Sequence, residues 1–286
     1  MPTPPPDEGR EPASPRPADD HEPAPVPTSP SSPPPPTAHG ERTARGLPLP
    51  AALLALTVVS GIIDAVSYLA LGHVFTANMT GNVVVLGFAA AGAQGFFWAR
   101  VLVSLGAFLA GSAAGGWAGR KCAAEATSSG SAAPSGQGRR STARRTWLRL
   151  VLVTETVLLG GSSGVAAWSP GRTATLYTLI AVTAFAMGVR NATVRRLGVA
   201  DLTTTVLTMT LTGLAADSPL GDGRPVRTVR RLGSTLALLG GAVLGAWLVL
   251  HHGLWTPLLA AAAISGVLAL TVSGRVPSTD RGPASR

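Results

Sequence analysis

The sequence predicts an all-α fold: a polytopic transmembrane helical bundle of about six spans plus two short re-entrant helices. Only 13% of the 286 residues are charged, about half the fraction usual in a soluble domain. Long stretches of Ala, Val, Leu and Gly lie between the charged loops, and stretches of about 18 such residues match the thickness of a hydrocarbon core. A large buried core would instead show shorter amphipathic stripes, so we expect the lipid bilayer to be the main partner.

The chain is predicted to have three parts. Residues 1–46 hold most of the 24 prolines and almost no large apolar side chains. Such a segment cannot bury enough surface to offset its ordering entropy, which predicts a disordered cytoplasmic tail. A proline-recognising partner is the alternative use of the tail. The transmembrane domain is expected over residues 47–274, and a short disordered cytoplasmic tail over 275–286.

The transmembrane domain divides into six predicted spans and two shorter segments. The spans are 48–71, 97–119, 147–168, 173–189, 232–250 and 255–272. The shorter segments are 78–92 and 202–216; a helix over the first would reach only about 22 Å, too short for a comfortable crossing. We therefore expect both to be re-entrant. A long Ser/Gly/Arg-rich loop is expected between the second and third spans, ending at Arg145.

The positions of the basic residues predict the orientation. Cytoplasmic loops carry an excess of Lys and Arg, and with both short segments re-entrant every basic cluster falls on one side. Both termini are then expected to be cytoplasmic. The near-replacement of lysine by arginine suggests a GC-rich bacterial genome, and we expect the chain in the inner membrane of a bacterial cell. Topology thus explains the net charge of +9 without nucleic acid. The clusters are Arg42 and Arg45; Arg120 and Lys121; Arg139, Arg140, Arg144 and Arg145; Arg190, Arg195 and Arg196; Arg224, Arg227, Arg230 and Arg231; and Arg275.

The two halves of the domain, about 47–168 and 173–274, are predicted to be inverted repeats. Each half has a span, a short segment and two more spans. The motif Gly61-x-x-Asp64-Ala65 followed by Leu71-Gly72 is matched by Gly188-x-x-Asn191-Ala192 followed by Leu197-Gly198, with a one-residue gap. The first half starts inside and the second outside, and such a plan is typical of secondary transporters.

The first candidate site contains Asp64, Asn78, Thr80 and Asn82. A carboxylate within a span costs about 2.5–3.5 kcal/mol, so Asp64 should face the bundle interior and have a partner. The three other residues stand at the start of a short helix, whose N-terminus favours anions. These side chains form either a solute or ion pathway or a lock in which Asp64 bonds Asn78 or Asn82.

The second candidate site contains Asn191 and the threonines Thr204, Thr208 and Thr212, which recur every four residues and share one helical face. Their hydroxyls can line a polar path or bond carbonyls one turn earlier. Glu155, about two turns into its span, is a further pathway candidate. Pairing with an arginine is the competing interpretation, and the sequence offers Arg100 or Arg190.

Other chemistry has little support in the sequence. His251-His252 has no acidic or cysteine neighbours, which argues against a metal site. No nucleotide-binding glycine loop, zinc motif or serine–histidine set is present in usable form. We therefore expect no cofactor and no enzymatic activity.

The stretch Gly72-His73-x-Phe75-Thr76-Ala77-Asn78-Met79-Thr80-Gly81-Asn82, with Asp64 before it, resembles the YoaK-like family of bacterial membrane proteins, defined by domain of unknown function 1275. The resemblance runs from about Leu47 to Val272 and includes Asn191-Ala192 and Thr204-Thr205-Val206-Leu207-Thr208. A glutamine usually precedes Asn191 in that family, whereas this chain has Arg190. The resemblance implies an integral membrane protein and brings no activity with it.

These patterns predict a secondary transporter or permease for a small polar solute or anion, coupled to protons or sodium. Asp64 and Glu155 would carry the coupling, and the amide and hydroxyl side chains would bind the solute. The alternatives are a non-transporting scaffold or accessory subunit, whose tail recruits partners, and a passive channel. The sequence leaves open whether several copies form a homo-oligomer.

Overall fold

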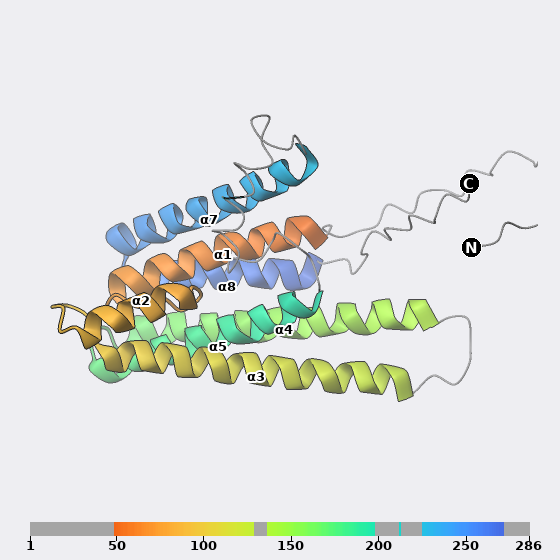
Figure 1. Ribbon diagram of the computed structural model, residues 1–286, viewed down its shortest axis with the longest axis horizontal. Helices are drawn as coiled ribbons and strands as arrows, with labels where there is room; N and C mark the ends of the chain where they lie inside the picture. The colour runs from red at the N-terminus through yellow and green to blue at the C-terminus, as the bar shows by residue number, and fades with distance from the viewer. Residues whose placement is uncertain (1–48, 129–135, 198–211, 213–224, 272–286) are drawn as a thin grey trace, which may run out of the picture. The chain divides into compact units, whose positions relative to one another are not determined.

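The computed structural model describes residues 49–128, 136–197, 212 and 225–271, and this part of the chain is helical apart from short connections (Figure 1). The predicted helical bundle is therefore confirmed. Both predicted tails and most of the second short segment lie outside the described residues. The helices are α1 (Leu49–Ala70), α2 (Met79–Ala90), α3 (Trp98–Ser128), α4 (Gly136–Trp168), α5 (Thr173–Leu197), α7 (Pro225–His252) and α8 (Trp255–Thr271).

Five of the described helices are long and apolar enough to cross a membrane: α1, α3, α4, α5 and α7. The sixth predicted span is α8, whose 17 residues reach about 26 Å. The expected long loop before Arg145 is wrong in its extent, because α3 continues to Ser128 and α4 already begins at Gly136. The polar residues there are good helix formers or tolerated in a helix, so the helices run on past the apolar spans.

The connection between α1 and α3 leaves and returns at the same end of the bundle: α2 begins deeper in the bundle, beside Asp64 of α1 and Ser104 of α3, and ends at this end. Figure 1 shows the end of α1 and the start of α3 at this end, with α2 between them. Asn78 caps α2, its Oδ1 accepting a hydrogen bond from the Gly81 amide at 3.2 Å. With 12 residues, α2 reaches only about 18 Å. The apolar side chains of Val83 and Phe88 remain exposed, as expected for a helix that faces lipid.

The turn that leads from α1 to α2 needs a glycine. Gly72 has a φ of +92°, a conformation that is costly for residues with a Cβ. A Cβ there would also lie 2.8 Å from Cζ of Arg100, which packs across this turn from α3. The sequence around Gly72 therefore fixes where α1 stops and how the chain enters α2.

The crossing helices pack mainly as three pairs: α1 with α7, α3 with α5, and α4 with α8. Helix α4 also packs on α5, and α8 on α1, which joins the pairs into one bundle. Helices α1 and α5 are the most buried, whereas α3 and α7 carry many exposed apolar side chains, such as Leu109 and Leu239. These exposed faces suit a lipid solvent.

Two of the pairs are built with the same glycine contacts. A Cβ on Gly61 of α1 would come within 2.7 Å of the Ala242 amide nitrogen on α7, and a Cβ on Gly188 of α5 within 2.9 Å of the Ser112 amide nitrogen on α3. Small residues permit such close backbone packing between membrane helices. The facing helices also contribute glycines: Gly241 and Gly245 on α7, and Gly111 and Gly115 on α3.

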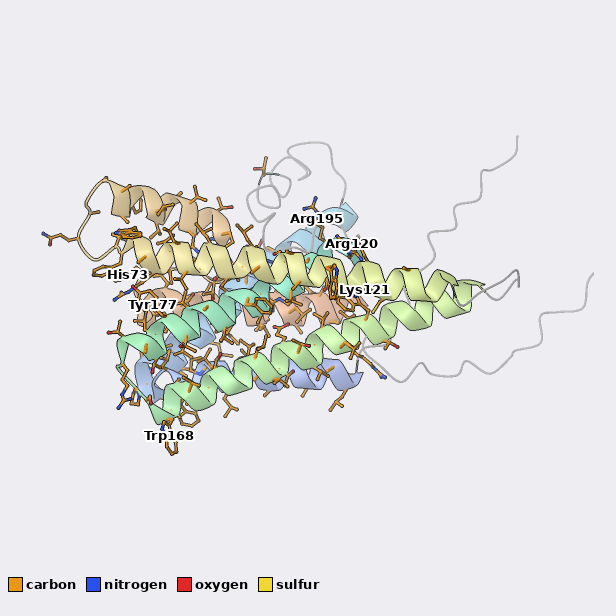
Figure 2. All side chains as sticks on the ribbon, turned by 90° about the horizontal axis from the view of Figure 1, so that it is seen from below. His73, Arg120, Lys121, Trp168, Tyr177 and Arg195 are labelled. Carbon is orange, nitrogen blue, oxygen red and sulfur yellow. The ribbon has the colours of Figure 1, made fainter. Side chains whose placement is uncertain are left out.

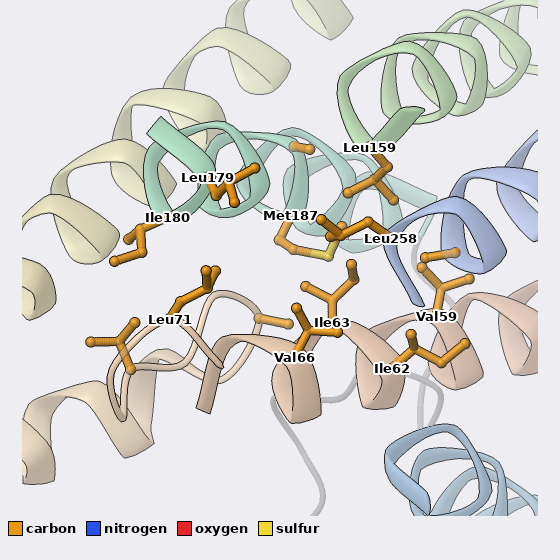
Figure 3. Close-up of a cluster of buried hydrophobic side chains, with 14 of the residues drawn as sticks. Val59, Ile62, Ile63, Val66, Leu71, Leu159, Leu179, Ile180, Met187 and Leu258 are labelled. Atoms are coloured by element: carbon orange, nitrogen blue, oxygen red, sulfur yellow. The ribbon is translucent and has the colours of Figure 1, made fainter. Parts of the chain in front are cut away.

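The apolar core lies where α1, α4, α5 and α8 meet (Figure 3). Most of its larger side chains are branched aliphatic groups, and several are completely inaccessible. They include Val59, Ile62, Ile63, Leu159, Leu179, Met187 and Leu258. This core surrounds the polar groups described below and separates them from lipid.

The glycine contacts can be tested with a single methyl group. Gly61→Ala should destabilise the protein by about 1–3 kcal/mol, because the new Cβ overpacks against the α7 backbone. Gly106→Ala on α3 is the matched control, since nothing lies within 4 Å of its Cβ position. Reversible unfolding in mixed micelles measures both. Equal effects at the two positions would contradict close glycine packing.

The re-entrant path of α2 predicts a labelling pattern. In a background without Cys122, a cysteine at Gln94 should react with a membrane-impermeant maleimide from the same side as a cysteine at Gly253, because both follow helices that end at the α2 end of the bundle. By the orientation expected from basic residues, that side is external. Labelling of the two positions from opposite sides would mean that α2 crosses.

Candidate functional site

An ion pair between Glu155 and Arg190 lies in the interior of the bundle. Arg190 Nη1 on α5 donates to Glu155 Oε1 on α4 at 2.9 Å, and the two side chains are only 3% and 1% exposed. Charged groups inside a membrane protein are costly unless they are paired. Of the two arginines offered by the sequence, the partner is Arg190; Arg100 instead lies over the Phe97 ring, 4.3 Å from its centroid.

Two serines complete this polar cluster. Arg190 Nη2 donates to Ser60 Oγ on α1, and Ser265 Oγ on α8 donates to Glu155 Oε1 at 3.2 Å. One residue from each of α1, α4, α5 and α8 thus meets at the centre of the bundle. We call Glu155, Arg190, Ser60 and Ser265 the central polar cluster.

The central polar cluster has spare hydrogen-bonding capacity. Glu155 Oε2 is buried and has no hydrogen-bond partner in the part of the chain that the structure describes. A buried acceptor without a partner costs about 1–3 kcal/mol. Such a group in a native protein calls for an explanation, and one explanation is an oxygen that takes up a proton or a ligand at some stage of function.

Asp64 lies on α1 and binds the last residues of the segment that leads into α2. Its Oδ1 accepts hydrogen bonds from three consecutive amides, those of Thr76 at 3.3 Å, Ala77 at 2.8 Å and Asn78 at 3.3 Å. A carboxylate is well suited to this position because charge-assisted bonds to amides are strong. Its bonds go to the backbone, rather than to the side chains of Asn78 or Asn82.

Asn82 holds the same segment from the other side. Its side chain accepts from the Phe75 amide at 2.8 Å and donates to the Phe75 carbonyl at 2.6 Å, so it pairs with one residue twice. Ser104 on α3 also donates to that carbonyl at 2.6 Å and accepts from Asn82 at 3.1 Å. Asp64 and Asn82 together satisfy the irregular backbone, which is obligatory at membrane depth.

The remaining predicted site residues are spread out. Asn78 and Thr80 are exposed at the start of α2. Asn191 lies on α5 next to Arg190, and its Nδ2 is buried without a partner among the described residues. Thr204 and Thr208 lie outside the described residues, and Thr212 is exposed. Asp64 and Asn82 thus belong to one cluster and Glu155 to another, at the bundle centre.

Sequence reasoning missed three serines that complete these clusters: Ser60, Ser104 and Ser265. All three are nearly inaccessible. Ser60 is one turn before Asp64 on α1, and hydroxyl groups in the middle of an apolar span are a usable but weak signal. Within the described residues, no group of three or more His, Cys, Asp or Glu is arranged to hold a metal ion.

The fold and the central polar cluster define a class: a polytopic helical membrane protein with a charged pair inside its bundle. The comparisons agree that the chain is a transmembrane protein. The family described as "Protein of unknown function (DUF1275)" matches residues 52–271, so the chain belongs to this family, as the resemblance implied.

A curated relative is the UPF0700 transmembrane protein YoaK of Bacillus subtilis (strain 168), with which this chain is 65% identical over 34 residues. That segment covers 12% of this chain and only 15% of the YoaK chain. No solved structure matches. The family and the relative support a membrane protein with transmembrane helices.

The hydrogen bonds that three backbone amides donate to Asp64 predict how substitutions of this residue change stability. Asp64→Ala should lower the free energy of unfolding by at least about 2 kcal/mol, because the amides of the buried residues Thr76 and Ala77 lose their acceptor, at a cost of about 1–3 kcal/mol each. Asp64→Asn should cost clearly less, since the amide oxygen can still accept. Unfolding in mixed micelles measures both variants. Equal losses would show that the charge of Asp64, and not its acceptor oxygen, is what the fold needs.

Proposed function

We propose that this protein is a proton-coupled secondary transporter for a small anion, located in a bacterial inner membrane with both termini cytoplasmic. The observation that carries the proposal is the central polar cluster: a buried Arg–Glu pair whose carboxylate has one oxygen, Glu155 Oε2, without a described partner. Replacing a buried ion pair by apolar residues of similar volume is often neutral or stabilising. Stability alone therefore does not explain why a membrane bundle carries this pair.

Arg190 is the proposed binding group for the anion. A guanidinium has five donors and suits carboxylate or phosphate-like oxygens. One donor nitrogen is occupied by Glu155 and another by Ser60. An incoming anion would take the place of the Glu155 carboxylate, so the protein's own carboxylate stands where the solute binds.

Glu155 is the proposed proton carrier. When the anion takes over Arg190, a carboxylate left unpaired in the interior would be costly, so Glu155 binds one proton. The bound state then holds Arg⁺, the anion and a neutral carboxyl group. For a monovalent anion its net charge equals that of the empty state, which holds Arg⁺ and the Glu155 carboxylate. On release, the carboxyl group loses its proton and pairs with Arg190 again. Anion and proton therefore cross together in a ratio of one to one.

The two conformations of such a transporter would come from inverted repeats. In this proposal α1 corresponds to α5, α3 to α7 and α4 to α8. The matching glycine contacts of the α1–α7 and α3–α5 pairs support it, as does the self-equivalent α4–α8 pair. Inverted repeats can exchange conformations to open the site to either side. In this proposal Asp64 and Asn82 hold the re-entrant helix, and coupling rests with Glu155.

Proteoliposome uptake of a panel of small inorganic and carboxylate anions tests the proposal. The wild type should take up at least one anion, and an inward proton gradient should accelerate uptake. Arg190→Gln should abolish uptake. Glu155→Gln should still exchange anions, but the acceleration of its uptake by a proton gradient should be at least about tenfold smaller than in the wild type. Arg172→Gln, an exposed arginine at the α2 end, is the matched control.

Folding of the variants is checked by size exclusion, because removing one partner of a buried pair costs about 3–5 kcal/mol. If the single variants misfold, the double variant Glu155→Gln/Arg190→Gln, which leaves no unpaired charge, should fold but not transport. Wild-type uptake by Arg190→Gln would refute the proposal. Flux without proton coupling would indicate a passive channel. A wild type that moves no anion, with a phenotype that depends on residues 1–46, would indicate a scaffold or accessory subunit.

A further inference from the structure

Four basic side chains gather where the apolar spans of α3 and α5 end. They are Arg120 and Lys121 on α3, and Arg195 and Arg196 on α5. All four are exposed. Figure 2 shows Arg120, Lys121 and Arg195 at one level of the bundle, far from His73 and Trp168 at the α2 end.

Arg196 is seated on α3 by a glycine. A Cβ on Gly119 would lie 2.7 Å from Arg196 Nη1 and 3.2 Å from Arg196 Cδ. The missing side chain at residue 119 therefore leaves room for the arginine to lie across the neighbouring helix. The three atoms nearest to that position all belong to the Arg196 side chain, whereas the nearest atoms at Gly111 and Gly115 are backbone atoms of Phe185 and Val189. Gly119 therefore makes room for the Arg196 side chain.

Lys121 is placed beside an aromatic ring at the same level. Its Nζ lies 4.0 Å from the centroid of the Trp117 ring, which is itself 53% exposed. Tryptophan is enriched where hydrocarbon meets headgroups. The apolar spans end at Cys122 on α3 and Arg196 on α5, so the four cations stand at headgroup depth.

No ion pair among the described side chains accounts for this charge. The ion pair found among the described side chains joins Glu155 to Arg190, and none of the four basic residues takes part in it. Arg195 and Arg196 lie in the last turn of α5, where cations are favoured by the helix dipole. The helix dipole does not favour Arg120 and Lys121 in this way, because α3 continues to Ser128 and neither residue lies in its last turn.

We infer that these four residues and Gly119 form a binding site for the phosphate headgroup of an anionic phospholipid. Basic pockets between membrane helices on the cytoplasmic side bind anionic headgroups, and guanidinium groups match phosphate oxygens in pairs. The Trp117 ring would pack on the part of the acyl chains next to the headgroup. The inference is independent of the transport proposal, since it concerns the end of the bundle opposite α2 and none of the residues of the central polar cluster.

Native mass spectrometry of the full-length protein, titrated with phosphatidylglycerol or phosphatidylcholine, tests the site. The wild type should bind one phosphatidylglycerol more tightly than phosphatidylcholine. Arg195→Gln/Arg196→Gln should weaken that binding about 25-fold, because each cation near an anionic surface contributes about fivefold. Gly119→Leu should weaken it at least about fivefold with no change in charge, by displacing Arg196.

The matched control is Arg139→Gln/Arg140→Gln, which removes the same charge from α4 outside its apolar span, Thr146–Trp168. This control should bind phosphatidylglycerol like the wild type. Equal losses in both double variants, or wild-type binding by Gly119→Leu, would mean diffuse attraction and overturn the inference. Displacement of the lipid by millimolar inorganic phosphate would assign the site to a free anion and overturn the lipid as its occupant.

Discussion

The Glu155–Arg190 ion pair is the interaction on which the centre of this bundle depends. Neither charge could remain alone in the interior, because breaking a buried pair costs about 3–5 kcal/mol. The pair also binds Ser60 and Ser265, so a single cluster joins α1, α4, α5 and α8. Any movement that separates these helices must therefore provide another anion for Arg190 and a proton for Glu155, which is why the same contact suggests both a structural and a transport role.

Away from this cluster, the bundle follows the rules of a lipid solvent. Burial of apolar side chains gives little drive to helix association there, so close backbone packing takes over. The glycines between α1 and α7 and between α3 and α5 supply that packing. Irregular backbone must also satisfy its own hydrogen bonds, and Asp64 and Asn82 do so for the segment before α2. The polar motif of the sequence thus has a clear local reason.

Span positions could be predicted from the sequence because hydropathy and length directly reflect bilayer thickness. The start of α2 was also predictable, since Asn78 is a good helix cap. The length of α3 and α4 beyond the membrane was not predictable. The apolar composition of a span stops where the lipid ends, whereas polar residues with adequate helix propensity can continue the helix. The choice of Arg190 over Arg100 as the partner of Glu155 depends on how α4 and α5 are rotated against each other. The roles of Ser60 and Ser265 depend on the same rotation, which span patterns do not encode.

The contrast between duplicated and single features separates packing from function. The glycine contacts of Gly61 recur at Gly188, and a contact that a fold needs twice is a packing contact. In the proposed inverted repeat, which aligns Gly61 with Gly188, Arg190 corresponds to Ile63, which is buried among apolar side chains. An apolar residue is therefore sufficient for packing at the corresponding position. Among the described residues the charged pair occurs once, and in the proposed transporter it lies where the two halves meet and the solute would pass. The helix packing of the proposed repeats does not need the Glu155–Arg190 pair. That pair is therefore the best candidate for a functional group rather than a packing contact.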